Sequence, residues 1–280
     1  MPVSQTLMEF FCNSFLFVLL RDGFCNLRTM MNVRFLGTGT SQGVPVIACD
    51  CEVCTSIDQK DVRLRSSIFI NNEDTHFVID TGPDFRAQLL NNNIQQLDAI
   101  VYTHEHKDHI AGMDDIRAFN FKQRKDMEVY ASPQVQVALQ REFHYVFADY
   151  KYPGIPEVNL NTIGSDPFMV GSFELLPIEV MHYKMPVNAY RVHDFTYITD
   201  AKTIAPEEIE KIRGSKTIVV NALRKDEHIS HFNLAQAIEF LQAMNPERGL
   251  LTHISHLMGK HEVVSNDLPA GIEIAYDGLL

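Results

Sequence analysis

Three histidines and an aspartate crowd into one short segment of the chain, Thr103-His104-Glu105-His106-Lys107-Asp108-His109. Neutral imidazoles and a carboxylate are good ligands for Zn²⁺, Mn²⁺ or Fe, and a group of this size can serve more than one ion. With 12 histidines among 280 residues, chance produces such a cluster on the order of once per thousand chains. The segment therefore predicts a metal centre rather than a merely polar loop.

The elements around this cluster predict an α/β protein. The apolar run 99–102 directly precedes it and is typical of a buried strand, so the cluster is expected at a strand's carboxyl end, where α/β proteins place their chemistry. Strand-like and helix-like segments alternate in both halves, which favours a layered α/β architecture. The strands are expected at 33–36, 67–71, 76–79, 99–102, 173–180, 190–192, 196–198, 218–221 and 249–251, and the helices at 85–90, 114–121, 133–147, 206–212 and 234–244.

Residues 150–167, rich in Pro, Gly and Asn, predict a long loop near the middle of the chain. It would either border a substrate pocket or simply link the two halves.

The five cysteines point to a reducing compartment, because three of them fall in Cys49-Asp50-Cys51-Glu52-Val53-Cys54. Thiols this close together do not suit ordinary structural disulfides and favour metal ligation instead. Three thiolates leave a structural zinc site one ligand short, so a fourth must come from elsewhere in the chain. The alternative is a reduced loop without metal. A cytoplasmic location is expected.

The formal net charge of −12 disfavours nucleic acid as a partner, since phosphate binding needs clustered Lys and Arg. Carboxylates around metal ions count toward this charge while the cations cancel them locally, so RNA is disfavoured without being excluded.

The first 30 residues contain an apolar run, Phe10 to Leu20. No Lys or Arg precedes it, no clear cleavage site follows, and it is short for a membrane span, so neither secretion nor membrane insertion is expected. The strand-like 32–36 follows Met30-Met31. We therefore expect one catalytic domain over 31–280, with 1–30 an N-terminal extension or the product of a misplaced start.

The motif His104-x-His106-x-Asp108-His109 resembles the signature of the metallo-β-lactamase superfamily. Other segments resemble the branch that contains the PhnP phosphodiesterases, which act on phosphoribosyl 1,2-cyclic phosphate. These are Gly37 to Pro45, the Cys49-x-Cys51-x-x-Cys54 triplet, Ile79-Asp80-Thr81-Gly82, Leu251-Thr252-His253-Ile254-Ser255-His256 and Ala275 to Gly278. The similarity runs from about Met31 to the C-terminus and implies a four-layer αββα sandwich.

The resemblance also implies a full ligand set. One catalytic ion would be held by His104, His106 and His182, the second by Asp108, His109 and His253, and Asp200 would bridge them. From the residues alone, Asp200 is a plausible strand-end carboxylate, whereas a lone His182 is more often structural. The Cys triplet would find its fourth ligand in His256 and form a structural zinc site.

The implied activity is hydrolysis of a phosphodiester by a hydroxide that two metal ions activate, with Asp108 in the metal centre and His231 near the leaving group. His231 and His228 could instead be surface histidines that cap a helix starting near Asn233. Asp80 is expected to orient a ligand by hydrogen bonds, although a turn-forming Asp would look the same.

A small cyclic or nucleotide-like phosphodiester is the expected substrate. The alternatives are a transfer-RNA 3′-processing endonuclease-like hydrolase and a non-catalytic metal-binding accessory protein of cofactor biosynthesis. The catalytic ions would be Zn, Mn or Fe, because His and Asp suit all three. A homodimer is a reasonable expectation for a soluble enzyme.

Overall fold

The computed structural model describes residues 30–150 and 152–280, and residues 31–280 form one compact unit. The predictions for residues 1–29 lie outside the described residues. Among the helices of the described part, none has the length and apolar character needed to cross a bilayer.

The first half of the unit builds one sheet. Within the described residues it has six strands in the order β1-β2-β3-β4-β5-β6, antiparallel from β1 to β3 and parallel from β3 to β6. The strands are β1 (Asn32–Gly37), β2 (Ser67–Asn71), β3 (His76–Ile79), β4 (Ala99–Val101), β5 (Met127–Ala131) and β6 (Val158–Thr162). The helices of this half are η1 (Gln59–Asp61), α1 (Phe85–Asn91), α2 (Lys107–Ile110), η2 (Met113–Ile116), α3 (Arg117–Gln123), α4 (Pro133–Glu142) and α5 (His144–Phe147).

The second half builds the other sheet, with described strands in the order β11-β8-β9-β10-β12-β13-β14 and β7 paired to β8. Its strands are β7 (Phe168–Val170), β8 (Phe173–His182), β9 (Met185–Val192), β10 (Phe195–Ile198), β11 (Thr203–Ile204), β12 (Thr217–Asn221), β13 (Arg248–Thr252) and β14 (Ile272–Ile274). Its helices are α6 (Pro206–Ile212), α7 (Leu234–Met244), η3 (His256–Met258) and α8 (His261–Asn266).

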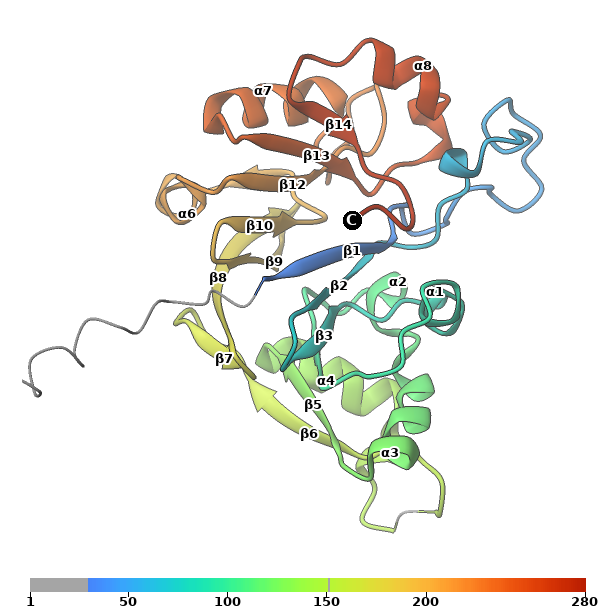
Figure 1. Ribbon diagram of the computed structural model, residues 1–280, viewed down its shortest axis with the longest axis vertical. Coiled ribbons are helices and arrows are strands. Elements are labelled where there is room, and N and C mark those ends of the chain that lie inside the picture. The colour runs from blue at the N-terminus through green and yellow to red at the C-terminus, as the bar shows by residue number, and fades with distance from the viewer. Residues whose placement is uncertain (1–29, 151) are drawn as a thin grey trace, which may run out of the picture. The chain divides into compact units, whose positions relative to one another are not determined.

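Three apolar clusters hold these layers together. One lies between the first sheet and its helices, one between the second sheet and its helices, and one between the sheets, where Phe77 and Phe173 meet edge to face at 5.5 Å. Figure 1 shows α7 and α8 on the outer side of the second sheet and α1, α3 and α4 beside the first. The predicted four-layer αββα sandwich is confirmed.

Two of the predicted elements differ most from the structure, and a third, the helix expected over 114–121, is divided between η2 and α3. The helix expected over 133–147 breaks at Phe143, whose φ of −118° and ψ of 41° separate α4 from α5. The segment 150–167, expected to be a loop, contains β6, which extends the first sheet in parallel with β5. Hydrogen bonding to a neighbouring strand outweighs the weak propensity of VNLNT for strand structure.

Candidate metal centre

The predicted ligands come from strand ends in both sheets. His104 to His109 follow β4, Asp200 follows β10 and His253 follows β13, all at carboxyl ends of strands that pair in parallel. His182 is the last residue of β8. Backbone at strand ends is free of ladder hydrogen bonds, so it can turn and aim side chains into one place.

The three histidines proposed for the first ion lie together. The ring centroids of His104 and His106 are 4.7 Å apart, those of His106 and His182 are 5.2 Å apart, and those of His104 and His182 are 6.1 Å apart. The Nδ1 of His182 donates to the carbonyl of Ser230 at 2.9 Å. That bond fixes the tautomer and leaves Nε2 as the free lone pair, the usual arrangement of a metal-binding histidine.

The residues proposed for the second ion converge on Asp200. Asp108 Oδ2 and Asp200 Oδ2 each lie 3.2 Å from His109 Nε2, and Asp200 Oδ2 lies 3.3 Å from His253 Nδ1. The His109 and His253 rings are nearly parallel, with centroids 5.9 Å apart. Asp200 thus contacts ligands of the second group while facing those of the first, as a bridging carboxylate must.

His109 shows that these residues fit a cation. Its Nδ1 is 2.7 Å from Asp80 Oδ2, in a position to donate, and Asp80 also accepts from the backbone and hydroxyl of Thr103. Its Nε2 is buried and makes no hydrogen bond of acceptable geometry, although two carboxylate oxygens lie near it. Nitrogen and oxygen atoms that lie close together without hydrogen-bonding to one another are arranged as the ligands of a metal ion are. The expectation that Asp80 orients a ligand agrees with these contacts.

Burial and neighbouring charges favour the metal-binding forms of His104, His253 and Asp200. At His109, by contrast, the carboxylates of Asp108 and Asp200 outweigh burial and raise the pKa well above the usual value. Burial lowers the pKa of His104 well below its usual value and that of His253 to about 4. Burial alone would raise the pKa of Asp200, but His253 and His109 hold it well below the usual range. Neutral imidazoles and ionised carboxylates are the forms that bind metal.

Hydroxyl groups that the sequence did not single out fix the ligands in place. Thr103 Oγ1 lies 2.9 Å from His104 Nδ1. Around His253, Thr40 Oγ1 lies 3.2 Å from Nε2, and Ser66 Oγ lies 3.2 Å from Nδ1. Thr103 adjoins a predicted ligand in the sequence, which could have drawn attention to it, whereas Thr40 and Ser66 carry no sequence signal for this role.

The backbone at the centre is under strain. Asp80, Asp200 and His253 have φ values of 65°, 57° and 57°, in the left-handed region that non-glycine residues seldom adopt. Such residues cost of order 1–3 kcal/mol each and cluster at functional sites. Gly82 allows the turn after Asp80 to pack against the segment His104 to His109, because a Cβ at position 82 would lie 2.2 Å from the carbonyl oxygen of Asp108.

His231 borders the centre and caps no helix. It is 8% exposed, its Nε2 lies 3.0 Å from Asp200 Oδ1, and its ring lies 4.5 Å from that of His182. The cap of α7 is Asn233, which forms a reciprocal capping box with Gln236. His228 is further out, with its Nδ1 3.2 Å from that of His231. The helix-capping interpretation of both histidines is therefore wrong.

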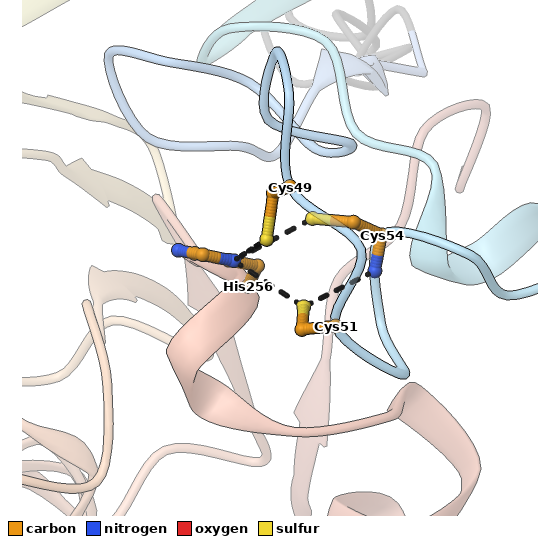
Figure 2. A group of neighbouring side chains, drawn as sticks. All are labelled: Cys49, Cys51, Cys54 and His256. Atoms are coloured by element: carbon orange, nitrogen blue, oxygen red, sulfur yellow. Dashed lines mark hydrogen bonds between the residues drawn. The ribbon is translucent and has the colours of Figure 1, made fainter.

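The cysteine triplet and His256 form a separate cluster (Figure 2). The Sγ atoms of Cys49, Cys51 and Cys54 lie 3.3, 3.4 and 3.5 Å from His256 Nδ1. Tetrahedral zinc with its usual Zn–S and Zn–N bonds would separate sulfur from nitrogen by about 3.5 Å. The backbone N–H of Cys54 donates to Cys51 and lowers the pKa of that thiol to about 6, which favours a thiolate.

Comparison with known proteins agrees with this geometry. Residues 75–254 match the Beta-lactamase superfamily domain. An octanoyltransferase of Porphyromonas gingivalis is 39% identical over 253 residues, which are 89% of this chain and 51% of that protein. The chain thus spans about half the length of the curated relative it matches.

Two solved structures are also similar. A diphosphatase of the PhnP family is 35% identical, with a TM-score of 0.83 over 89% of this chain and 96% of that one. Zn²⁺-bound PqqB from Methylobacterium extorquens is 20% identical, with a TM-score of 0.72 over 89% of this chain and 99% of that one, a likeness that shows the fold alone. The chain therefore belongs to the β-lactamase superfamily, with the metallo-β-lactamase fold of its PhnP-like branch.

Proposed function

We propose that the chain is a dinuclear metal-dependent phosphodiesterase that acts on a small cyclic or nucleotide-like phosphodiester. The observation that carries the proposal is the convergence of two ligand trios on one buried carboxylate, Asp200, with the lone pair of His109 left unpartnered among them. The similarity to a PhnP-family diphosphatase supports phosphate chemistry.

In this proposal His104, His106 and His182 hold one ion, Asp108, His109 and His253 hold the other, and Asp200 bridges them. Two divalent ions, Zn, Mn or Fe, would supply a water of lowered pKa and neutralise phosphate oxygens. The chain's own contribution is to hold its ligands rigidly: Asp80 fixes His109, and the carbonyl of Ser230 fixes His182.

His231 is the proposed general acid. A departing alkoxide needs a proton, and an imidazole at the edge of the site can deliver one at neutral pH. Asp200 Oδ1, 3.0 Å from Nε2, orients the ring toward the centre.

Cys49, Cys51, Cys54 and His256 are the proposed ligands of one structural zinc. The site would join the loop before β2 to the turn after β13, which also carries His253. Its role is therefore to position part of the catalytic centre.

The proposal is tested by metal counting and hydrolysis on the purified chain. We expect two catalytic ions and one zinc per chain by mass spectrometry, and hydrolysis of bis-p-nitrophenyl phosphate and of a cyclic ribose phosphate. Asp108→Ala should lower turnover at least about 100-fold. His144→Ala, at an exposed histidine on α5, is the matched control and should change nothing. A metal-loaded protein inert to every phosphodiester would contradict the proposal.

A second candidate is hydrolysis of an octanoyl ester or thioester. It is favoured by one observation, the 39% identity to half of a protein named octanoyltransferase. The same ions that polarise a phosphoryl oxygen would polarise a carbonyl. An octanoyl thioester assayed beside the phosphodiesters decides between the two, since cleavage of the thioester alone would replace the first candidate with the second.

A further inference from the structure

A shallow, open cleft of about 620 Å³ adjoins the proposed first metal site. Its lining includes His106 and His182 of that site, the turn Tyr183–Lys184 and Ile229. This volume is in the range of sites for small molecules. A phosphodiester bound at the ions would place part of its organic group in this cleft.

The walls of the cleft offer apolar surface to that group. Tyr183 and Ile229 are 52% and 64% exposed, and Met185 and Pro186 add further apolar lining. A tyrosine ring presents a flat, rigid face on which another ring can stack. The apolar part of the lining therefore suits a planar ring.

The backbone conformation at Tyr183 is unusual for a residue with a large side chain. Tyr183 and Lys184 form the two-residue turn between β8 and β9, where His182 pairs with Met185. Tyr183 has a φ of 58°, and the first position of such a turn favours glycine when φ is positive. A tyrosine there bears strain that glycine would avoid. Such strained residues cluster at functional sites.

Polar groups stand at the rim. The Nζ of Lys184 lies 5.3 Å from the centroid of the Tyr183 ring, and Gln134 Nε2 donates to Glu105 Oε1 at 2.6 Å. The lysine can meet an anionic group, and the carboxylate and amide can hydrogen-bond the edge of a heterocycle or a ribose hydroxyl.

We infer that this cleft is a base-binding subsite in which a nucleobase of the substrate stacks on Tyr183 opposite Ile229. The inference rests on the proposed function and narrows it to nucleoside phosphodiesters, in preference to cyclic ribose phosphates without a base.

The test compares adenosine 2′,3′-cyclic phosphate with methyl riboside 2′,3′-cyclic phosphate, which lacks the base. Wild type should show the higher kcat/KM on the adenosine substrate. Tyr183→Gly, which removes the ring and relieves the turn, should lower that kcat/KM about 5- to 100-fold, as expected for one lost base–aromatic stack. The same substitution should leave kcat/KM on the methyl riboside substrate unchanged. Tyr183→Phe should retain the preference, and Tyr150→Ala, at a tyrosine 83% exposed elsewhere, is the control.

Calorimetry with adenosine monophosphate separates this inference from the proposed function. Binding that weakens about 5- to 100-fold in Tyr183→Gly and not in Tyr150→Ala supports the subsite even if no phosphodiester is cleaved. Equal kcat/KM on both cyclic substrates, with hydrolysis intact and Tyr183→Gly without effect, would overturn the subsite and leave the phosphodiesterase standing.

Discussion

At the scale of the residue, the proposed role of His231 as general acid predicts how the reaction depends on its leaving group. An alkoxide leaves only as it gains a proton, whereas p-nitrophenolate is stable enough to leave without one. We therefore expect His231→Ala to lower turnover of a cyclic ribose phosphate about 100-fold or more and to change hydrolysis of bis-p-nitrophenyl phosphate only a few-fold. Steady-state kinetics on both substrates measure the difference.

His228→Ala is the matched control for this prediction, because His228 contacts His231 without contacting Asp200. It should retain the wild-type ratio between the two substrates. An equal loss on both substrates in His231→Ala, or a loss of metal from that variant, would show that His231 holds the centre together and is not an acid.

Spacing alone predicts the residues His104 to His109, because ligands within six residues of one another need only a local turn to meet. His182, Asp200 and His253 reach the centre from strands separated by long stretches of chain. Resemblance to a family indicated all three, whereas residue chemistry alone supported only Asp200, as a carboxylate at the end of a strand. Thr40 and Ser66 had no signal at all, since a hydroxyl becomes a partner of His253 only once the segments after β1, before β2 and after β13 meet.

At the scale of the element, the cysteine loop should depend on zinc for its order. Cys51→Ala removes one thiolate from a site that has three, and we expect loss of one zinc per chain and faster amide exchange over residues 46–62. Exchange should also rise around His256. Elemental mass spectrometry measures the zinc content, and hydrogen-exchange mass spectrometry measures the exchange rates.

Ile57→Ala is the control within the same loop, since this side chain is 97% exposed. It should keep all the zinc. The contrary result would be a Cys51→Ala protein that retains the full metal count and the wild-type exchange rates, which would mean that the cysteines form a reduced loop without metal.

Elements with strong local patterns were predictable. The strands over 67–71 and 76–79 and the helices over 206–212 and 234–244 have the predicted bounds. Apolar runs and a proline at the start of α6 mark their limits locally. β6 has no such pattern, and it is a strand because β5 offers it hydrogen bonds. The break at Phe143 likewise reflects packing, as its buried ring joins the cluster beneath α4.

At the scale of the folded unit, a buried network joins segments far apart in the sequence. Arg63 is 3% exposed and donates to Thr38 Oγ1 at 2.8 Å and to the carbonyl of Ala275 at 2.6 Å. Its Nη2 lies 3.1 Å from His261 Nδ1, which must accept. The alternation of strands and helices along the sequence predicted the layers of the fold. It could not predict these long-range polar contacts, because no local sequence pattern indicates that a buried Arg63 will contact His261.

This network predicts a pH dependence of stability. Burial and the nearby Arg63 lower the pKa of His261 to about 4, while an unfolded histidine has a pKa of about 6.5. As pH falls below 6.5 the unfolded chain gains a proton that the folded chain refuses until about pH 4, so the free energy of unfolding falls across this window. His261→Gln keeps an acceptor for Arg63 and does not titrate.

We therefore expect the free energy of unfolding of wild type to fall between pH 7.5 and pH 5 by about 1 to 2 kcal/mol more than that of His261→Gln. Urea unfolding of both proteins at the two pH values measures this, and metal ligands that titrate contribute equally to both and cancel. Parallel pH profiles would mean that His261 takes up its proton in the folded state, and that Arg63 shifts away to allow it.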